Sequence, residues 1–380
     1  MSEQQSKPSQ ADEKGLSYGN FADPIGLVWR MLIEGGRIGR STLAIEALSK
    51  IVTPLDWMLS GKEQRLRKEA AASDLPIVLI VGPPRSGTTL LYQVLANHWE
   101  VSYFTNCNAM FPRSPVMAAK LFEKSFVPPA SKKQGTKYNS LYGNTAGLRG
   151  PNDGFHIWNQ FFGEDRYDIP ERLSDELQTE MQRLFAAWLE ITKRPLLNKN
   201  NRNTVCCATI ANALPNARFV IVERRPWFVA QSLIKARKWV QGSKKLGWGL
   251  GAESVQQGTD HLAYVEAVCK QVANHQKQLH IQMQAIQPER VLYTTYESFC
   301  SDPAEFVEQA MAWLPEISMR DGRTLESLSP FRCSDKWSLP AETVDRIQSL
   351  LPESIDGKAE VPRPHFSQAT EVARREPPRP

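Results

Sequence analysis

The chain has 380 residues, 41% of them apolar, and a formal net charge of +5. This length and composition allow a large buried core, arranged as one α/β domain or as two smaller ones. The charge is mildly basic, which suits a small, multiply anionic ligand and is too weak to indicate binding to nucleic acid.

The sequence shows none of the usual signs of a membrane-spanning or exported protein. No apolar run approaches the roughly 20 residues of a membrane-spanning helix, and residues 1–20 are polar, unlike a signal peptide. The six cysteines form no C-x-x-C pair and have no metal-ligand spacing, as is usual in a reducing compartment. We therefore expect a cytoplasmic protein without a metal site.

The N-terminal part of the chain divides into two segments. Residues 1–22 are polar and are expected to be disordered, and residues 23–70 are expected to form a helical extension. In the second segment, apolar residues such as Leu27 and Met31 recur at helical spacing. Such an amphipathic layer usually packs on a protein core. The arginines beside it leave open a peripheral contact with a membrane or a partner through residues 24–60.

A strand, a tight loop and a helix then follow one another. The aliphatic run 77–81 predicts a buried strand, and helical spacing of apolar residues begins at Leu90. The loop between them places backbone N–H groups at the positive end of a helix dipole, where anions bind. It differs from the ATPase loop G-x-x-x-x-G-K-[ST] because Thr88 occupies the lysine position and Arg85 carries the positive charge. We expect it to hold phosphate-like groups without hydrolysing ATP.

The rest of the chain alternates between short apolar runs and helical patterns. Residues 138–168 are rich in glycine, asparagine and aromatic residues and are typical of a substrate loop. Residues 241–260 are predicted to be a mobile polar linker, and residues 361–380 a loosely ordered tail. Strands are expected at 101–104, 195–197, 218–223 and 290–297, and helices at 174–191, from 226, and at 261–286, 303–314 and 340–351.

This alternation predicts a P-loop-type α/β domain over residues 71–360, with a parallel sheet and helices on both faces, beside the N-terminal helical extension. In such sheets ligands bind at the carboxyl ends of the strands. Arg224 follows one predicted strand, and Ser232 lies eight positions later, about two turns into the next helix. An arginine and a hydroxyl from neighbouring elements can bind one further phosphate.

With both strand-to-helix junctions considered, the chain resembles sulfotransferases that use 3′-phosphoadenosine 5′-phosphosulfate (PAPS), in a bacterial branch similar to tyrosylprotein sulfotransferases. The resemblance covers residues 75–315. It implies that Arg224 and Ser232 bind the 3′-phosphate and that Tyr296 borders the adenine. It further implies that the 5′-phosphosulfate group is bound by the loop residues Pro84, Arg85, Ser86, Gly87, Thr88 and Thr89.

The activity implied by this resemblance is transfer of a sulfuryl group to a hydroxyl or amine, with adenosine 3′,5′-bisphosphate (PAP) as the other product and no metal. Lys199 and Arg85 would stabilise charge at the sulfuryl group. Small molecules, carbohydrates and lipids all remain open as acceptors, and the oligomeric state is open too.

Such a transfer needs a general base. In tyrosylprotein sulfotransferases a glutamate after the loop serves as base, but residues 105–108 here hold no acid. The two candidates are Asp153 and His156 in the turn-rich stretch.

Two other functions fit the same loop. A nucleotide kinase or another P-loop NTPase would turn over ATP with magnesium and would need no 3′-phosphate. A non-catalytic nucleotide-binding protein of the same fold would bind the nucleotide without transfer to any acceptor.

Overall fold

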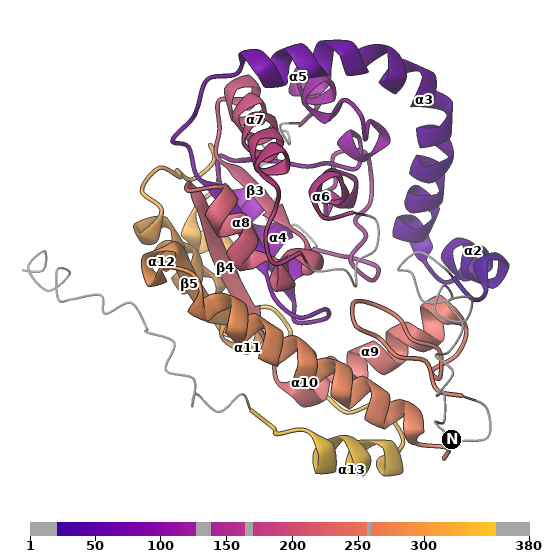
Figure 1. The fold of residues 1–380 in the computed structure, drawn as a ribbon. Coiled ribbons are helices and arrows are strands. Elements are labelled where there is room, and N and C mark those ends of the chain that lie inside the picture. Colours follow the sequence, from indigo (N-terminus) through magenta and orange to yellow (C-terminus); the bar gives the residue numbers. More distant parts are fainter. Residues whose placement is uncertain (1–20, 127–137, 164–169, 257–259, 355–380) are drawn as a thin grey trace, which may run out of the picture.

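The computed structural model describes residues 21–126, 138–163, 170–256 and 260–354. At its centre is a parallel sheet with the strand order β2-β3-β1-β4-β5 (Figure 1). The expected α/β fold is therefore confirmed, whereas the expectations for residues 1–20 and 361–380 lie outside the described residues. The strands are β1 (Ile77–Val81), β2 (Ser102–Tyr103), β3 (Leu196–Lys199), β4 (Ala217–Glu223) and β5 (Val291–Thr295).

Helices connect the strands and form the N-terminal extension. They are α2 (Pro24–Ile33), α3 (Gly36–Glu69), α4 (Thr88–His98), α5 (Pro115–Phe126), α6 (Phe155–Phe162), α7 (Asp175–Thr192), α8 (Cys207–Ala213), α9 (Pro226–Gln241), α10 (Ala263–Gln284), α11 (Tyr296–Ser301), α12 (Pro303–Trp313) and α13 (Ala341–Leu350).

Both faces of the sheet are buried, as the continuous aliphatic sequence of β1 predicts. Alternate residues of a strand point to opposite faces, so Ile77 and Leu79 pack with residues of α6, α7, α8 and α10, while Val78 and Ile80 pack with residues of α4 and α12. Strands β3 and β4 flank β1. The carboxyl ends of these three strands therefore meet at the middle of one edge, where the loop of residues 82–87 begins.

The long helix α3 arches over α5 and α7 (Figure 1), and two buried carboxylates anchor it there. Asp56 accepts a hydrogen bond from Ser114 Oγ at 2.6 Å, and Glu63 accepts one from the backbone N–H of Met117 at 2.8 Å. Both carboxylates face the N-terminus of α5, where the helix dipole favours negative charge. The N-terminal helical extension is thus packed on the domain, as expected.

The outward faces of α2 and α3 are apolar and exposed. No helix within the described residues combines the length and the apolarity needed to cross a bilayer. Contact of this surface with a membrane or a partner stays a prediction. Its exposed side chains are Ile25, Val28, Trp29, Leu32 and Ile33 on α2, and Leu48, Ile51, Leu55, Trp57 and Met58 on α3.

Residues 241–256, between α9 and α10, do not form the mobile linker that their glycines suggested. The segment is packed against α10, where Gln271 Nε2 donates to the carbonyls of Leu250 at 2.9 Å and Trp248 at 3.2 Å. Leu250 is buried. Gly249 has a φ of 87°, in the left-handed region that glycine adopts at no steric cost. Gly249 therefore permits a tight turn in a segment that is packed against α10.

Candidate active site

The loop after β1 forms a tight turn that ends at the first residue of α4. Thr204 Oγ1 accepts from the N–H of Gly82 at 3.0 Å and donates to the carbonyl of Gly82 at 2.9 Å. Gly87 has a φ of 96°, and a Cβ at this position would lie 2.3 Å from Cδ2 of Tyr296. Arg85 has a φ of 73°, which non-glycine residues rarely adopt. The turn therefore requires glycine at position 87 and brings the Tyr296 ring against the loop.

Donors in this loop are arranged to receive an anion. The first N–H groups of an α-helix have no acceptor within the helix, and Gly87, the N-cap of α4, has no side chain to provide one. Ser86 is fully buried, and its Oγ has no hydrogen-bond partner among the described residues. The first N–H groups of α4 therefore fit a phosphate or sulfate oxygen, whereas the buried Ser86 Oγ is not exposed to one.

Arg224 lies directly after β4 and holds the backbone of the loop after β1. Its Nη1 donates to the carbonyl of Arg85 at 3.0 Å, and its Nη2 donates to the carbonyl of Ser334. The guanidinium carbon lies 4.5 Å from the centre of the Tyr296 ring, a cation–π contact. Arg224 Nε is buried without a partner in the described part of the chain. Since a guanidinium has five N–H donors and these two bonds use two of them, the side chain keeps donors for a ligand.

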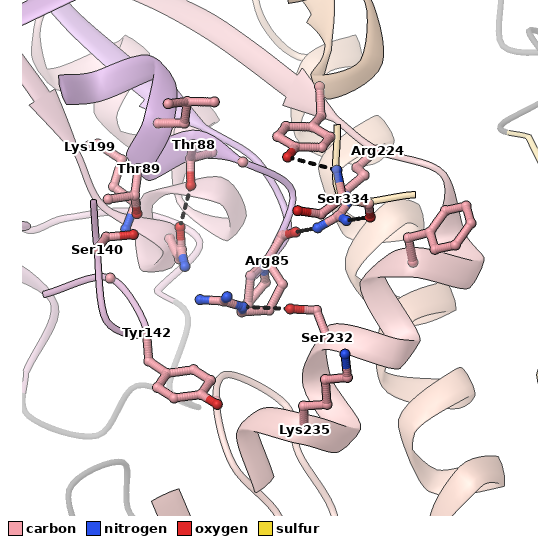
Figure 2. Close-up of a pocket in the computed structure, with 18 of the residues that line it drawn as sticks. Arg85, Thr88, Thr89, Ser140, Tyr142, Lys199, Arg224, Ser232, Lys235 and Ser334 are labelled. Atoms are coloured by element: carbon pink, nitrogen blue, oxygen red, sulfur yellow. Dashed lines mark hydrogen bonds between the residues drawn. The ribbon is translucent and has the colours of Figure 1, made fainter. Parts of the chain in front are cut away.

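Ser232 projects from α9 into the same space (Figure 2). We predicted that Arg224 and Ser232 bind one phosphate together. The structure brings both to one cavity but links them through Arg85, whose Nε donates to Ser232 Oγ at 2.9 Å and whose carbonyl accepts from Arg224. An anion bound here would meet all three side chains.

These residues line one cavity of about 760 Å³, a size typical of small-molecule sites. Of the predicted site residues, Pro84, Gly87, Thr88, Thr89 and Tyr296 also line it, whereas Ser86 is buried and does not. Asp153 is the sole acid among its described lining residues, which favours a multiply anionic ligand. The cations that line it are Arg85, Lys199, Arg202, Arg224, Lys235, Arg332 and Lys336.

The sequence analysis missed four of these cations: Arg202, Lys235, Arg332 and Lys336. Lys235 lies on α9 three positions after Ser232, so helical spacing could have indicated it. Arg332 and Lys336 belong to the irregular segment between α12 and α13, which no motif marks. The fold alone brings this segment to the loop, where the N–H of Ser334 donates to the hydroxyl of Tyr296 at 3.3 Å.

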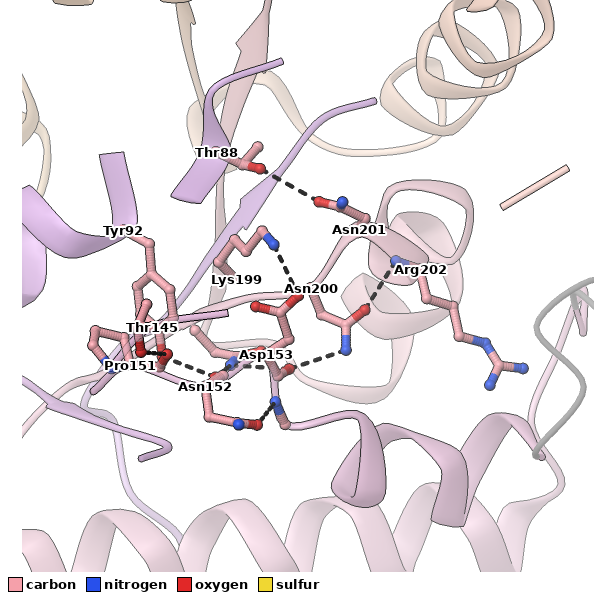
Figure 3. Close-up of polar contacts among 12 residues, drawn as sticks. Thr88, Tyr92, Thr145, Pro151, Asn152, Asp153, Lys199, Asn200, Asn201 and Arg202 are labelled. Atoms are coloured by element: carbon pink, nitrogen blue, oxygen red, sulfur yellow. Dashed lines mark hydrogen bonds and ion pairs between the residues drawn. The ribbon is translucent and has the colours of Figure 1, made fainter. Parts of the chain in front are cut away.

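Lys199 and Asp153 form an ion pair beside Thr88 and Thr89, away from Ser232 and Lys235 (Figures 2 and 3). Lys199 ends β3, and its Nζ lies 2.8 Å from Asp153 Oδ2. The Lys199 side chain is 2% exposed and that of Asp153 is 17% exposed. Since an ammonium group has three N–H donors, the pair leaves Lys199 able to contact a ligand oxygen as well.

Three asparagines fix the backbone around Asp153. Asn200 Nδ2 donates to the Asp153 carbonyl at 3.0 Å, and Asn198 Nδ2 lies 3.4 Å from the same oxygen. Asn152 Oδ1 accepts from the N–H of Gly154 at 2.9 Å (Figure 3). The sequence predicted a polar, turn-rich stretch but not this network, because Asn198 and Asn200 come from β3 and the residue after it. The network holds the Asp153 carboxylate toward Lys199.

His156, the other candidate base, does not line the cavity. It lies in the first turn of α6, and its Nε2 is buried without a hydrogen-bond partner among the described residues. Burial lowers the pKa of His156 to about 4. The structure therefore brings Asp153 to the cavity and leaves His156, as a neutral ring, among packed side chains.

The buried His156 should make stability depend on pH. Its folded-state pKa of about 4 is below the ordinary value near 6.5, so the unfolded chain binds the extra proton first as pH falls below about 6.5. From pH 7 to pH 5 we expect the wild type to lose about 2 kcal/mol more unfolding free energy than His156→Gln. Urea unfolding at both pH values measures this. An equal loss in both proteins would show that His156 is accessible to protons in the fold.

Comparison with known proteins agrees with this geometry. Residues 76–320 match the sequence model of the sulfotransferase family, whereas no curated protein matches the chain. Sulfotransferase STF9 from Mycobacterium avium has a TM-score of 0.45 and 15% identity, over 76% of this chain and 70% of its own. Sulfotransferase STF1 from Mycobacterium tuberculosis has a TM-score of 0.49 and 12% identity, over 88% and 93%. The sulfotransferase domain from the curacin biosynthetic pathway has a TM-score of 0.36 and 17% identity, over 80% and 100%.

These three similarities are too low to support a comparison of sites. The family match is different, because it spans more than half of the chain and includes the loop, β3 with Lys199, and the segment from Arg224 to Ser232. On this match, the chain belongs to the sulfotransferase family.

Proposed function

We propose that this sulfotransferase moves the sulfuryl group of PAPS to a hydroxyl or amine of an acceptor, with Asp153 as general base. The observation that carries the proposal is that a single cavity is lined by the anion-binding loop, by Arg224 and Ser232, and by the Lys199–Asp153 pair. A doubly phosphorylated donor and a proton acceptor can thus meet in one place.

The donor would lie along the cationic wall of the cavity. The N–H groups at the start of α4 suit the 5′-phosphosulfate end, because they are donors without acceptors within the helix. Arg224, Ser232 and Lys235 suit the 3′-phosphate, since a charged hydrogen bond to phosphate is strong and directional. Tyr296, held against the loop by Arg224, suits one face of the adenine.

The transfer step follows from the positions of Asp153 and Lys199. PAPS supplies the sulfuryl group, whose bond to the bridging oxygen of the 5′-phosphate breaks as the acceptor atom bonds to sulfur, and PAP leaves with that electron pair. The Asp153 carboxylate takes the proton of the acceptor. Lys199 Nζ donates to the bridging oxygen, where negative charge develops. Its ion pair with Asp153 supports assigning both groups to the same transfer.

The donor assignment is tested with two ligands that differ in the 3′-phosphate. A hydrogen bond to a charged group contributes ~1.5–3 kcal/mol, so Arg224→Ala should weaken PAP binding at least tenfold. It should barely change the binding of adenosine 5′-phosphosulfate, which lacks the 3′ group. Titration calorimetry of both ligands against wild type and variant measures the difference.

The matched control is Arg225→Ala, which removes the neighbouring positive charge. Arg225 points to Glu297, at 3.8 Å, and does not line the cavity, so PAP affinity should stay within about twofold of wild type. Arg224 also holds the carbonyl of Arg85. If Arg224→Ala weakens the binding of both ligands equally, Arg224 supports the loop and does not bind the 3′-phosphate. If the wild type binds both ligands with equal affinity, PAPS is not the donor.

A further inference from the structure

A second cavity, of about 540 Å³, adjoins the first at Asp153. We propose that it binds the body of the acceptor, and that the acceptor is an apolar alcohol: an alkyl chain or ring system with a hydroxyl group at one end. This inference rests on the proposed function, because it takes Asp153 as the point where the hydroxyl is deprotonated. The residues common to both cavities are Tyr142, Gly143, Asp153, Phe155, Trp248 and Gly249.

The walls of this cavity are mainly hydrocarbon and aromatic. Glu46 and Asp153 are the only charged residues among the described side chains that line it, and neither is a cation. An anionic acceptor body would be desolvated here without a compensating charge, which is costly. The apolar lining comes from α2, α3, the end of α9 and two loops, and includes Leu27, Met31, Leu43, Tyr142, Trp239 and Trp248.

The polar side chains in the lining are largely committed to bonds within the protein. Gln241 accepts from the N–H of Ala22 at 3.0 Å and donates to the carbonyl of Gly247 at 3.1 Å. Thr42 Oγ1 donates to the carbonyl of Ile38 at 3.0 Å.

The amides nearest Asp153 are committed in the same way. Asn106 Nδ2 donates to the carbonyl of Gly147 at 2.8 Å, and Asn106 Oδ1 accepts from Asn152 Nδ2 at 2.9 Å. Asn152 Oδ1 is taken by the N–H of Gly154. A sugar needs many free hydrogen-bonding groups around it, since unmatched hydroxyls lose their bonds to water. These bonds therefore argue against a carbohydrate and for an apolar body.

Helix α2, which closes the cavity, is fixed to the end of α9 by Arg30. The Nε and Nη2 of Arg30 donate to the carbonyls of Trp239 at 2.5 Å and Val240 at 3.2 Å, which belong to the last turn of α9, where carbonyls lack partners and cations are favoured. Trp239 Nε1 donates to Glu34 Oε2 at 3.1 Å. The α2 side of the apolar wall is thus held in place by polar contacts made by Arg30 and Glu34, neither of which lines the cavity.

The apolar lining continues to the outside of the molecule through α2. Val28 lines the cavity and is 43% exposed, next to the exposed Trp29 and Leu32 on the same helix. Exposed apolar side chains in a contiguous patch mark surfaces that meet apolar partners. An acceptor with a hydrocarbon body would enter the cavity past these side chains with little loss of hydration, whereas a strongly hydrated acceptor would lose contacts with water.

The inference is tested on the full chain saturated with PAP, with 1-decanol and methyl β-glucoside as the two probes in titration calorimetry. We expect 1-decanol to bind and methyl β-glucoside not to bind. Leu43→Trp places a bulky ring inside the cavity and should lower the affinity for 1-decanol at least tenfold, because an overfilled site excludes the ligand. Leu43→Gln adds an amide to the wall without adding volume, and it should also lower the affinity for 1-decanol.

The matched control is Leu48→Trp, on the same helix but exposed and outside the cavity lining; 1-decanol should bind it as it binds wild type. PAP affinity, measured in each variant, reports both folding and the donor site. If PAP binds but 1-decanol does not, or if Leu43→Trp and Leu48→Trp bind it equally, the apolar acceptor is wrong while the donor proposal stands. Binding of methyl β-glucoside alone would make the acceptor a carbohydrate. Failure of PAP to bind the wild type would overturn the proposed function itself.

Discussion

Asp153→Asn is expected to lower kcat by ~10²–10⁴-fold, the usual contribution of a general base, with little change in PAP affinity. Asparagine keeps the shape of the side chain and still offers Lys199 an amide oxygen, but it cannot take a proton. The deprotonation of the acceptor is therefore lost, together with the charge of the ion pair to Lys199. The carbonyl bonds from Asn198 and Asn200 involve the backbone and remain. Turnover of PAPS with a fixed acceptor, together with PAP calorimetry, measures the two effects separately.

His156→Gln is the paired control for this prediction. Its ring does not line the cavity, so kcat should stay close to wild type, apart from any loss of folded protein. A large fall in kcat for His156→Gln at full folding, with near-normal turnover for Asp153→Asn, would reverse the assignment of the base. Near-normal rates in both variants would place the base outside residues 138–163.

Lys199→Met should reduce kcat by ~10²–10³-fold, the scale for removing one preorganised group that stabilises developing charge. Methionine fills a similar volume, which matters because Lys199 is 1% exposed and a cavity would cost stability. PAP affinity should change little, since Lys199 lies beside Thr88 and Thr89, away from Ser232 and Lys235 (Figure 2). Steady-state rates and PAP calorimetry at one pH test this.

Combining Lys199→Met with Asp153→Asn gives a more specific result. The two side chains are 2.8 Å apart and act on the same transfer, so the double variant should lose less rate than the product of the single losses. Strictly multiplicative losses would mean that the two groups act independently. An unchanged kcat in Lys199→Met alone would reduce Lys199 to a structural partner of Asp153.

The parts of the site that are local in sequence could be predicted. The loop needs only an aliphatic strand, two glycines and a helix start, and these follow one another between residues 77 and 90. The same holds for the helix expected at 174–191, where Ser174 is the N-cap of α7 and accepts from the N–H of Leu177. In each case a short stretch of chain contains the whole physical reason for its structure.

The parts that depend on distant contacts could not be predicted. Arg332 and Lys336 reach the cavity only because their segment crosses the carboxyl edge of the sheet, and nothing in their immediate sequence signals an anion. Arg85 was assigned to the 5′ end, yet its side chain reaches Ser232 on α9, because a positive φ at this residue redirects it. Glycines in residues 241–256 indicated mobility, since a glycine that permits motion and one that permits a tight turn look alike in sequence.

The way α2 is attached has a consequence for how this protein can diversify. Helices α2 and α3 lie outside residues 76–320, the part shared with the family, and Arg30 fixes α2 through main-chain carbonyls of α9, whose geometry does not depend on the side chains around them. Substitutions on the inner face of α2 can therefore accumulate without altering that attachment or the Lys199–Asp153 pair. If the second cavity binds the acceptor as proposed, the part of its lining that α2 and α3 contribute can change while the Lys199–Asp153 pair stays the same.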